Sequence, residues 1–158
     1  MNIQFQIKAI EDVSLNHFFD LSEEELKDIN AVKMIVNEKP GFPCRVSLED
    51  ANIGEEVILF PFAHHKVNSP YQSSGPIFIR KNARIAQLEI NEIPIMLKHR
   101  LLSLRIYDGE GMMIDGLTVE GKTLGKEIEN VFENESAKYI QIHNASPGCY
   151  NCQVDRVD

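Results

Sequence analysis

The feature that most constrains the fold of this chain is a series of short strand-like runs joined by tight turns. The clearest pair comprises residues 101–107 and 112–119, which are separated only by the turn residues 108–111. Two strands this close in sequence must run antiparallel, because a parallel connection needs a crossover of about a dozen residues or more. The same close spacing recurs along the chain without a regular alternation of strands and helices. The sequence therefore predicts a mainly antiparallel sheet.

Other strands are expected at residues 3–7, 31–36, 44–48, 56–62, 77–79, 139–142 and 150–154, with a loop over 69–76. A capping box at Ser22 and Glu25 predicts a short helix. The helical spacing of Leu124, Ile128 and Phe132 predicts a second helix over residues 123–133, and residues 83–97 fit either a strand or a helix. We expect a single α+β domain over residues 1–158, a mostly antiparallel sheet of eight or nine short strands with two or three helices.

Composition and charge exclude several classes of protein. The 158 residues, 43% apolar and 25% charged, are typical of one globular domain. A net charge of −8 opposes binding to nucleic acid or to an anionic membrane, and no apolar run approaches the ~20 residues of a membrane span. The first seven residues alternate instead of forming an export signal, and three cysteines, an odd number, suit reduced thiols. We expect a cytoplasmic protein that binds neither nucleic acid nor membrane.

The charge is unevenly distributed along the chain. Residues 62–107 carry a net charge of +5, and the remainder carries −13. This basic window is interpreted either as a solvated face or as one wall of a pocket for an anionic ligand. Arginine side chains suit a carboxylate or phosphate, and serine hydroxyls and glycine amides are further donors. The ligand-binding residues expected for such a pocket are Arg45, Ser74, Gly75, Arg80, Arg105 and His143.

The last predicted hairpin brings together two residues with chemical potential. A loop over residues 144–148 would set His143 directly opposite Cys149, with their Cβ atoms ~5 Å apart. An imidazole at this distance would accept the thiol proton and create a nucleophile, so His143 and Cys149 are candidate catalytic residues. The alternative is a hydrogen-bonded polar histidine at a strand end, because a register slip of one residue breaks the pairing.

Three motif matches have simpler structural explanations. Residues 116–123 match the phosphate-binding P-loop pattern, but residues 117–120 are typical of a strand rather than of a phosphate cradle. Cys149 and Cys152 have the spacing of a metal or redox pair, yet strand positions three apart point to opposite faces. His64 and His65 are adjacent and would also face opposite ways. We therefore expect no metal site, and the sequence identifies no cofactor.

Several segments together resemble a known family. They are residues 41–45, 50–51, 54–55, 69–71, 74–80, 104–108, 111–115, 143–145 and 148–149. In these segments the chain, from about residue 41 to residue 156, resembles the bacterial family catalogued as domain of unknown function 1203. The resemblance implies a small stand-alone cytosolic protein, and it brings no reaction, cofactor or catalytic residue.

Two functions from different classes remain open. The leading expectation is a small-molecule binding protein or enzyme whose anion-binding pocket is formed by the 62–107 window and the 139–154 hairpin. The alternative is a protein-interaction or structural module without catalytic activity, in which the basic window and the acidic remainder attract a partner or a second copy. The sequence leaves open the oligomeric state, the ligand and whether the protein is an enzyme.

Overall fold

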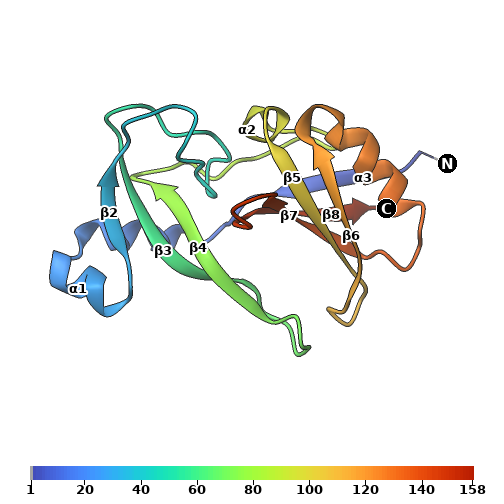
Figure 1. Cartoon of the computed structure of the whole chain (residues 1–158), viewed down its shortest axis with the longest axis horizontal. Coiled ribbons are helices and arrows are strands. Elements are labelled where there is room, and N and C mark those ends of the chain that lie inside the picture. Colours follow the sequence, from blue (N-terminus) through green and yellow to red (C-terminus); the bar gives the residue numbers. More distant parts are fainter. Residues whose placement is uncertain (1) are drawn as a thin grey trace.

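The strands form two antiparallel sheets that lie side by side in the computed structural model, which describes residues 2–158 (Figure 1). The five-stranded sheet has the order β1-β8-β7-β5-β6, with β1 (Gln4–Lys8), β5 (Leu101–Tyr107), β6 (Met113–Glu120), β7 (Tyr139–Asn144) and β8 (Tyr150–Val157). The three-stranded sheet has the order β2-β3-β4, with β2 (Val32–Ile35), β3 (Glu56–His65) and β4 (Ser73–Arg80). The predicted α+β class and antiparallel pairing are confirmed, but the strands divide between two sheets.

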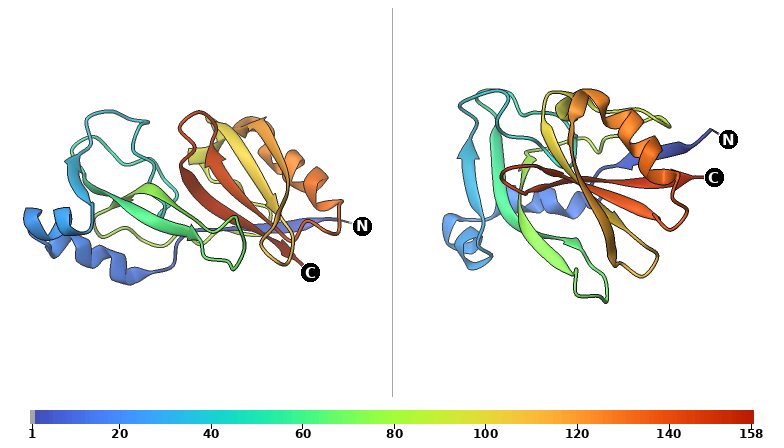
Figure 2. Two further views of the ribbon diagram at one scale, coloured as in Figure 1. Left: turned by 60° about the horizontal axis from the view of Figure 1, so that its bottom comes forward. Right: turned by 45° about the vertical axis from the view of Figure 1, so that its right-hand side comes forward.

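Five helical segments accompany the sheets in residues 2–158: η1 (Val13–Asp20), α1 (Glu23–Asp28), α2 (Ile95–Lys98), η2 (Gly121–Thr123) and α3 (Leu124–Phe132). The predicted capping box of α1 is formed, since Ser22 Oγ accepts from Glu25 N at 3.1 Å and Glu25 Oε1 accepts from Ser22 N at 3.0 Å. The predicted amphipathic helix is α3, which covers one face of the five-stranded sheet (Figure 2). None of the helices in the described residues is long and apolar enough to cross a membrane.

Each sheet has its own hydrophobic core. The five-stranded sheet packs against α3 and against Met96 and Leu97 of α2. The three-stranded sheet packs against Phe19 of η1 and Leu26 of α1. Tyr150 begins β8 of the first sheet but is buried in the core of the second. This shared aromatic residue joins the two halves into one compact domain.

Two local predictions are wrong. Residues 44–48, predicted as a strand, turn back on themselves: the Cys44 amide donates to the Glu49 carbonyl at 2.9 Å, the Leu48 amide donates to the Cys44 carbonyl at 2.9 Å, and Leu48 has a φ of 53°. The tertiary contacts of this segment override its strand-like composition. Ser73 and Gly75, predicted in a loop, lie in β4. Residues 83–97 are mostly irregular and only their end enters α2.

Candidate functional site

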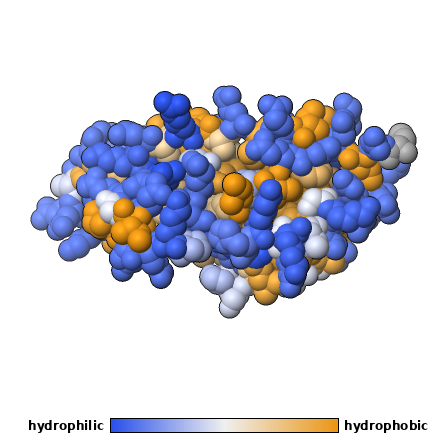
Figure 3. Space-filling view, turned by 90° about the horizontal axis from the view of Figure 1, so that it is seen from above, coloured by the Kyte–Doolittle hydropathy of each residue, from blue (hydrophilic) through white to orange (hydrophobic). Residues whose placement is uncertain are grey.

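A cleft of about 780 Å³ opens between the loop 39–52 and the segment 86–99. The loop belongs to the connection from β2 to β3, and the segment leads into α2 and β5, so the cleft lies between the two halves. Leu48, Leu88, Ile93 and Met96 give it an apolar wall. Seen from above, apolar surface lies between the more hydrophilic flanks of the molecule (Figure 3). Pockets that hold small ligands have volumes of roughly 300–1,000 Å³, so this cleft is large enough for one.

Asp50 lines this cleft and is held by two basic side chains. Its side chain is only 8% exposed. Arg100 Nη1 donates to Asp50 Oδ2 at 3.1 Å, and Arg100 Nη2 donates to Oδ1. His99 Nε2 lies 3.1 Å from the same Oδ2 atom. Because two parallel contacts to a guanidinium fix the plane of a carboxylate, His99 faces an acceptor of fixed orientation.

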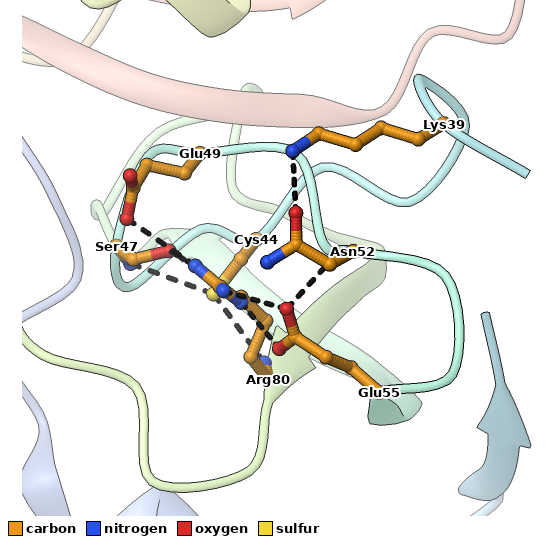
Figure 4. A network of polar contacts seen from close by, with 7 residues as sticks. All are labelled: Lys39, Cys44, Ser47, Glu49, Asn52, Glu55 and Arg80. Carbon is orange, nitrogen blue, oxygen red and sulfur yellow. Dashed lines mark hydrogen bonds and ion pairs between the residues drawn. The ribbon is translucent and has the colours of Figure 1, made fainter.

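Arg80, one of the predicted ligand-binding residues, lines the same cleft but has carboxylate partners of its own (Figure 4). Its Nε and Nη2 atoms donate to the two carboxylate oxygens of Glu55 at 2.8 and 2.7 Å, and Nη1 lies 3.2 Å from Glu49 Oε1. The hydrogen bonds from Arg80 lower the pKa of Glu55 to about 2. The charge of Arg80 is therefore compensated within the protein and is not free to attract an anion.

Two lysines of the cleft differ from Arg80 in this respect. Lys39 and Lys98 line the cleft, and neither forms an ion pair with a carboxylate of residues 2–158. The Nζ atom of Lys39 donates to the side-chain oxygen of Asn52. Glu92 also lines the cleft, and its carboxylate accepts from the Glu89 amide at 3.0 Å. The two lysines are therefore the positive groups of the cleft that lack a carboxylate partner within residues 2–158.

Arg45, predicted to bind the ligand, joins the two halves instead. Its side chain is buried, with 1% of the residue exposed. Its Nε atom donates to the Tyr150 carbonyl oxygen at 2.7 Å, and Nη1 donates to the Pro43 carbonyl oxygen. Burial lowers the pKa of Arg45 to about 10. No carboxylate of the described residues pairs with this guanidinium, so backbone carbonyls receive its hydrogen bonds.

His143 is buried where the two sheets meet, near Arg105 and His64. Its Nδ1 atom donates to the Gly148 carbonyl oxygen at 2.9 Å, and Nε2 lies 3.2 Å from Gln141 Oε1. The Gln141 amide is fixed by His64, since Oε1 accepts from His64 Nδ1 at 2.8 Å and Nε2 donates to the His64 carbonyl at 2.7 Å. Burial lowers the pKa of His143 to about 3, and the positive charge of Arg105 acts in the same direction. Arg105 and His143 therefore lie near each other, on the neighbouring strands β5 and β7.

The predicted opposition of His143 and Cys149 is wrong by one residue. A β-bulge follows Ile142, which pairs with Cys152, and it places His143 opposite Tyr150. Asn151 is the extra residue of this bulge. The Nδ1 atom of His143 donates to the Gly148 carbonyl oxygen instead, its Nε2 atom lies beside Gln141 Oε1, and half-buried Cys149 lies in the turn. A bulge cannot be recognised from the length of a hairpin loop, which explains the error.

The remaining predicted ligand residues lie elsewhere. Ser74 is exposed on β4, and Gly75 pairs with Phe62 of β3. A Cβ atom at Gly75 would have no neighbour within 4 Å, so packing does not require a glycine there. Of the predicted set, only Arg80 lines the cleft, while Arg45, Arg105 and His143 lie where the sheets meet.

The P-loop match at residues 116–123 is a strand and a helical turn. Gly116 and the residues up to Glu120 lie in β6 and pair with β5, so their amides do not converge on a phosphate. Gly121 starts η2, and a Cβ atom there would lie 1.7 Å from the Leu97 carbonyl oxygen. This glycine is needed for close packing on α2. Within residues 2–158, no three His, Cys, Asp or Glu side chains gather to hold a metal ion.

The family model described as protein of unknown function DUF1203 matches residues 41–156. The chain belongs to this family. The matched segment of this DUF1203 member contains Asp50, His99 and almost the entire lining of the cleft, whereas β1 and β2 precede it. Comparison with curated proteins finds no match, and comparison with solved structures finds none. The family supplies no activity, so the function has to be argued from the geometry.

Sequence reasoning did not find the group Asp50, His99 and Arg100. Each residue has a sequence signal, because Asp50 lies in a family-like segment and the other two lie in the basic window. Asp50 and His99 are 49 positions apart, however, and no motif spacing connects them. Only the packing of loop 39–52 against α2 brings the carboxylate and the imidazole together.

Proposed function

We propose that this DUF1203 member binds a small organic anion in the cleft between loop 39–52 and segment 86–99. The observation that carries the proposal is a cleft of about 780 Å³ in which an apolar wall adjoins two lysines outside any ion pair of residues 2–158. Small-molecule sites combine this kind of concave apolar surface with a few polar groups that orient the ligand. The function is thus of the first class expected from the sequence, at a different place in the fold.

The two lysines without a carboxylate partner among the described residues favour an anionic ligand. Arg80 is compensated by Glu49 and Glu55, and Asp50 is compensated by Arg100. Glu49 and Glu55 place two carboxylates on Arg80, so the cleft as a whole is formally neutral, and Lys39 and Lys98 are its positive groups outside any ion pair of residues 2–158. A ligand with one carboxylate and an apolar body matches both the two lysines and the apolar wall.

Thermal unfolding at pH 7 and fixed salt tests this proposal, with benzoate and phenylacetate as probes and benzyl alcohol as the uncharged comparison. A ligand at a hundredfold its Kd adds ~2.7 kcal/mol, which raises the Tm of a domain of this size by roughly 5–10 °C. We expect the two carboxylates to raise the Tm and benzyl alcohol to raise it less. The double variant Lys39→Gln, Lys98→Gln is expected to lose most of the shift.

Lys126→Gln is the matched control, because Lys126 lies on α3 outside the cleft with a side chain that is 73% exposed. Its response to benzoate should equal that of the unmodified protein. Equal shifts in the double variant and in this control would contradict the assignment to the cleft. No shift with either carboxylate would contradict organic-anion binding altogether.

The junction of the two sheets is a second candidate for anion binding. Arg105 lies near His64 and His143, and it has no carboxylate partner among residues 2–158. This is the part of the molecule where the 62–107 window meets the 139–154 hairpin. If phosphate raises the Tm, and this rise is lost in Arg105→Gln but kept in the lysine double variant, the junction is favoured over the cleft.

The competing interpretation is a protein-interaction module. The edge strand β2 exposes Val32 by 53% and Ile35 by 58%, and β3 is its single partner among the strands of residues 2–158. This function would be favoured if the mass of the protein in solution rises with concentration and if the double variant Val32→Thr, Ile35→Thr stays at the mass of the monomer. A monomeric protein that binds benzoate would favour the cleft.

A further inference from the structure

His99 differs from the other four histidines of the chain in its surroundings. Its side chain is 42% exposed, lines the cleft and lies at hydrogen-bonding distance from a carboxylate. His65 and His143 are buried and have partners at both ring nitrogens. His64 is bonded to an amide, and exposed His17 lies 4.0 Å from Asp20. Only His99 combines access to a cleft with a carboxylate in contact.

The contact with Asp50 determines which nitrogen of His99 carries the hydrogen. A carboxylate can only accept a hydrogen bond, so Nε2, at 3.1 Å from Asp50 Oδ2, must donate. In the neutral ring the lone pair is then on Nδ1. No hydrogen-bond partner for Nδ1 is found within residues 2–158, which leaves this atom available to a molecule in the cleft.

The positions of both groups are fixed by their neighbours. The carboxylate of Asp50 is held in plane by Arg100, whose Nη1 also donates to the Met96 carbonyl oxygen. His99 ends α2, where its amide donates to the Leu97 carbonyl oxygen. An imidazole held by a carboxylate, with its second nitrogen accessible, is the arrangement by which proteins position a histidine for proton transfer.

We propose that His99 and Asp50 form a proton-transfer pair that acts on the organic anion bound in the cleft. Nδ1 of His99 takes a proton from an acidic O–H or C–H group of the ligand, the electron pair of that bond stays on the ligand, and the proton returns when the product forms. Asp50 is the positioning residue: it holds the tautomer and faces the positive ring that results. The step needs no oxidant or reductant. The inference rests on the proposed binding of an organic anion and adds the class of reaction.

The first test needs no ligand. Long-range ¹H–¹⁵N NMR spectra of the imidazoles at pH 8 show which ring nitrogen carries the hydrogen. We expect the Nε2–H form for His99, whereas His143, whose Nδ1 atom donates to the Gly148 carbonyl oxygen, should show the Nδ1–H form. In Asp50→Asn the preference of His99 should weaken. A ring of His99 that carries its hydrogen on Nδ1 would overturn the proposal.

The second test measures proton transfer with phenylpyruvate, which combines an apolar ring, one carboxylate and an acidic C–H group. Exchange of that proton in D₂O is followed by ¹H NMR for the protein, for His99→Gln and for buffer alone. A general base contributes typically ~10²–10⁴-fold, so the protein should accelerate exchange at least tenfold over buffer and His99→Gln should remove this. Asp50→Asn should lower the rate without abolishing binding.

Thermal shifts measured on the same samples separate the two proposals. If phenylpyruvate raises the Tm of both the protein and His99→Gln but the proton exchanges at the buffer rate in both, proton transfer is overturned and the binding proposal stands. Absence of any Tm shift with phenylpyruvate, benzoate and phenylacetate overturns the binding proposal and this inference with it. Both variants fold if their circular dichroism and unfolding transitions match those of the unmodified protein.

Discussion

The substitution Gly121→Ala separates the packing role of Gly121 from the phosphate-binding role that its motif match would give it. The added Cβ would lie 1.7 Å from the Leu97 carbonyl oxygen, 2.8 Å from the Leu97 carbonyl carbon and 2.9 Å from the Lys98 carbonyl carbon. Because all three atoms belong to the backbone at the end of α2, no side-chain rotation relieves the contact. Overpacking of a core costs typically ~1–3 kcal/mol, and a clash this close with backbone places the expected loss at about 3 kcal/mol.

The measurement is the free energy of unfolding in urea, together with the Tm. For a domain of 150–250 residues, 1 kcal/mol shifts the Tm by ~2–4 °C, so a fall of roughly 6–12 °C is expected. Gly125→Ala is the matched control, because its Cβ would meet Ile93 Cγ1 at 3.8 Å, an ordinary contact, within α3. This control should be neutral or gain up to ~1 kcal/mol. Unchanged stability in Gly121→Ala with loss of phosphate binding would refute the packing argument.

Three further predictions follow from the described contacts. Arg80→Met should lower the free energy of unfolding by roughly 2 kcal/mol at pH 7. Because the pKa of Glu55 is lowered to about 2, this difference from the unmodified protein should shrink as the pH falls from ~4.5 towards 2. A difference that stays constant with pH in urea unfolding would contradict this. Because the pKa of His143 is lowered to about 3, the free energy of unfolding should be constant above pH ~6.5 and fall as the pH is lowered towards 3. The expected decrease at pH 5 is roughly 2 kcal/mol, and it should be absent in His143→Gln. In the native protein only the thiol of Cys149 should react rapidly with a disulfide reagent. The buried thiols of Cys44 and Cys152 should react only after unfolding, since burial raises the pKa of Cys152 to about 12, and three fast thiols would be inconsistent with the structure.

Local patterns predicted most of the elements, because neighbouring residues determine turns and amphipathic helices. The hairpin of β5 and β6 and the helix α3 are examples, as is the capping box of Ser22. The division into two sheets depends instead on contacts between distant segments. Arg45 illustrates the limit, since an arginine is usually exposed, yet here its guanidinium reaches a carbonyl 105 positions away.

The candidate site was predicted less well than the fold. Arginine is a common residue type in anion-binding sites, but Arg80 and Arg100 are committed to carboxylates of their own chain. The partners Glu55 and Asp50 lie 25 and 50 positions away, so sequence spacing could not reveal that these charges are compensated. What the sequence does indicate is the basic window itself, which supplies Lys98 and His99 to the cleft.

The pairing of β1 with β8 joins nearly opposite ends of the described chain, Gln4 with Val157. During synthesis, therefore, β1 cannot pair with its neighbour until the residues of β8 have been made. Phe5 and Ile7, which are buried in the finished sheet, remain exposed for that time. Contacts of such long range slow folding, and unpaired strand edges attract other chains. Strand β8 thus completes the five-stranded sheet by pairing with β1, and the edge of β1 is open to aggregation for as long as β8 has not been made.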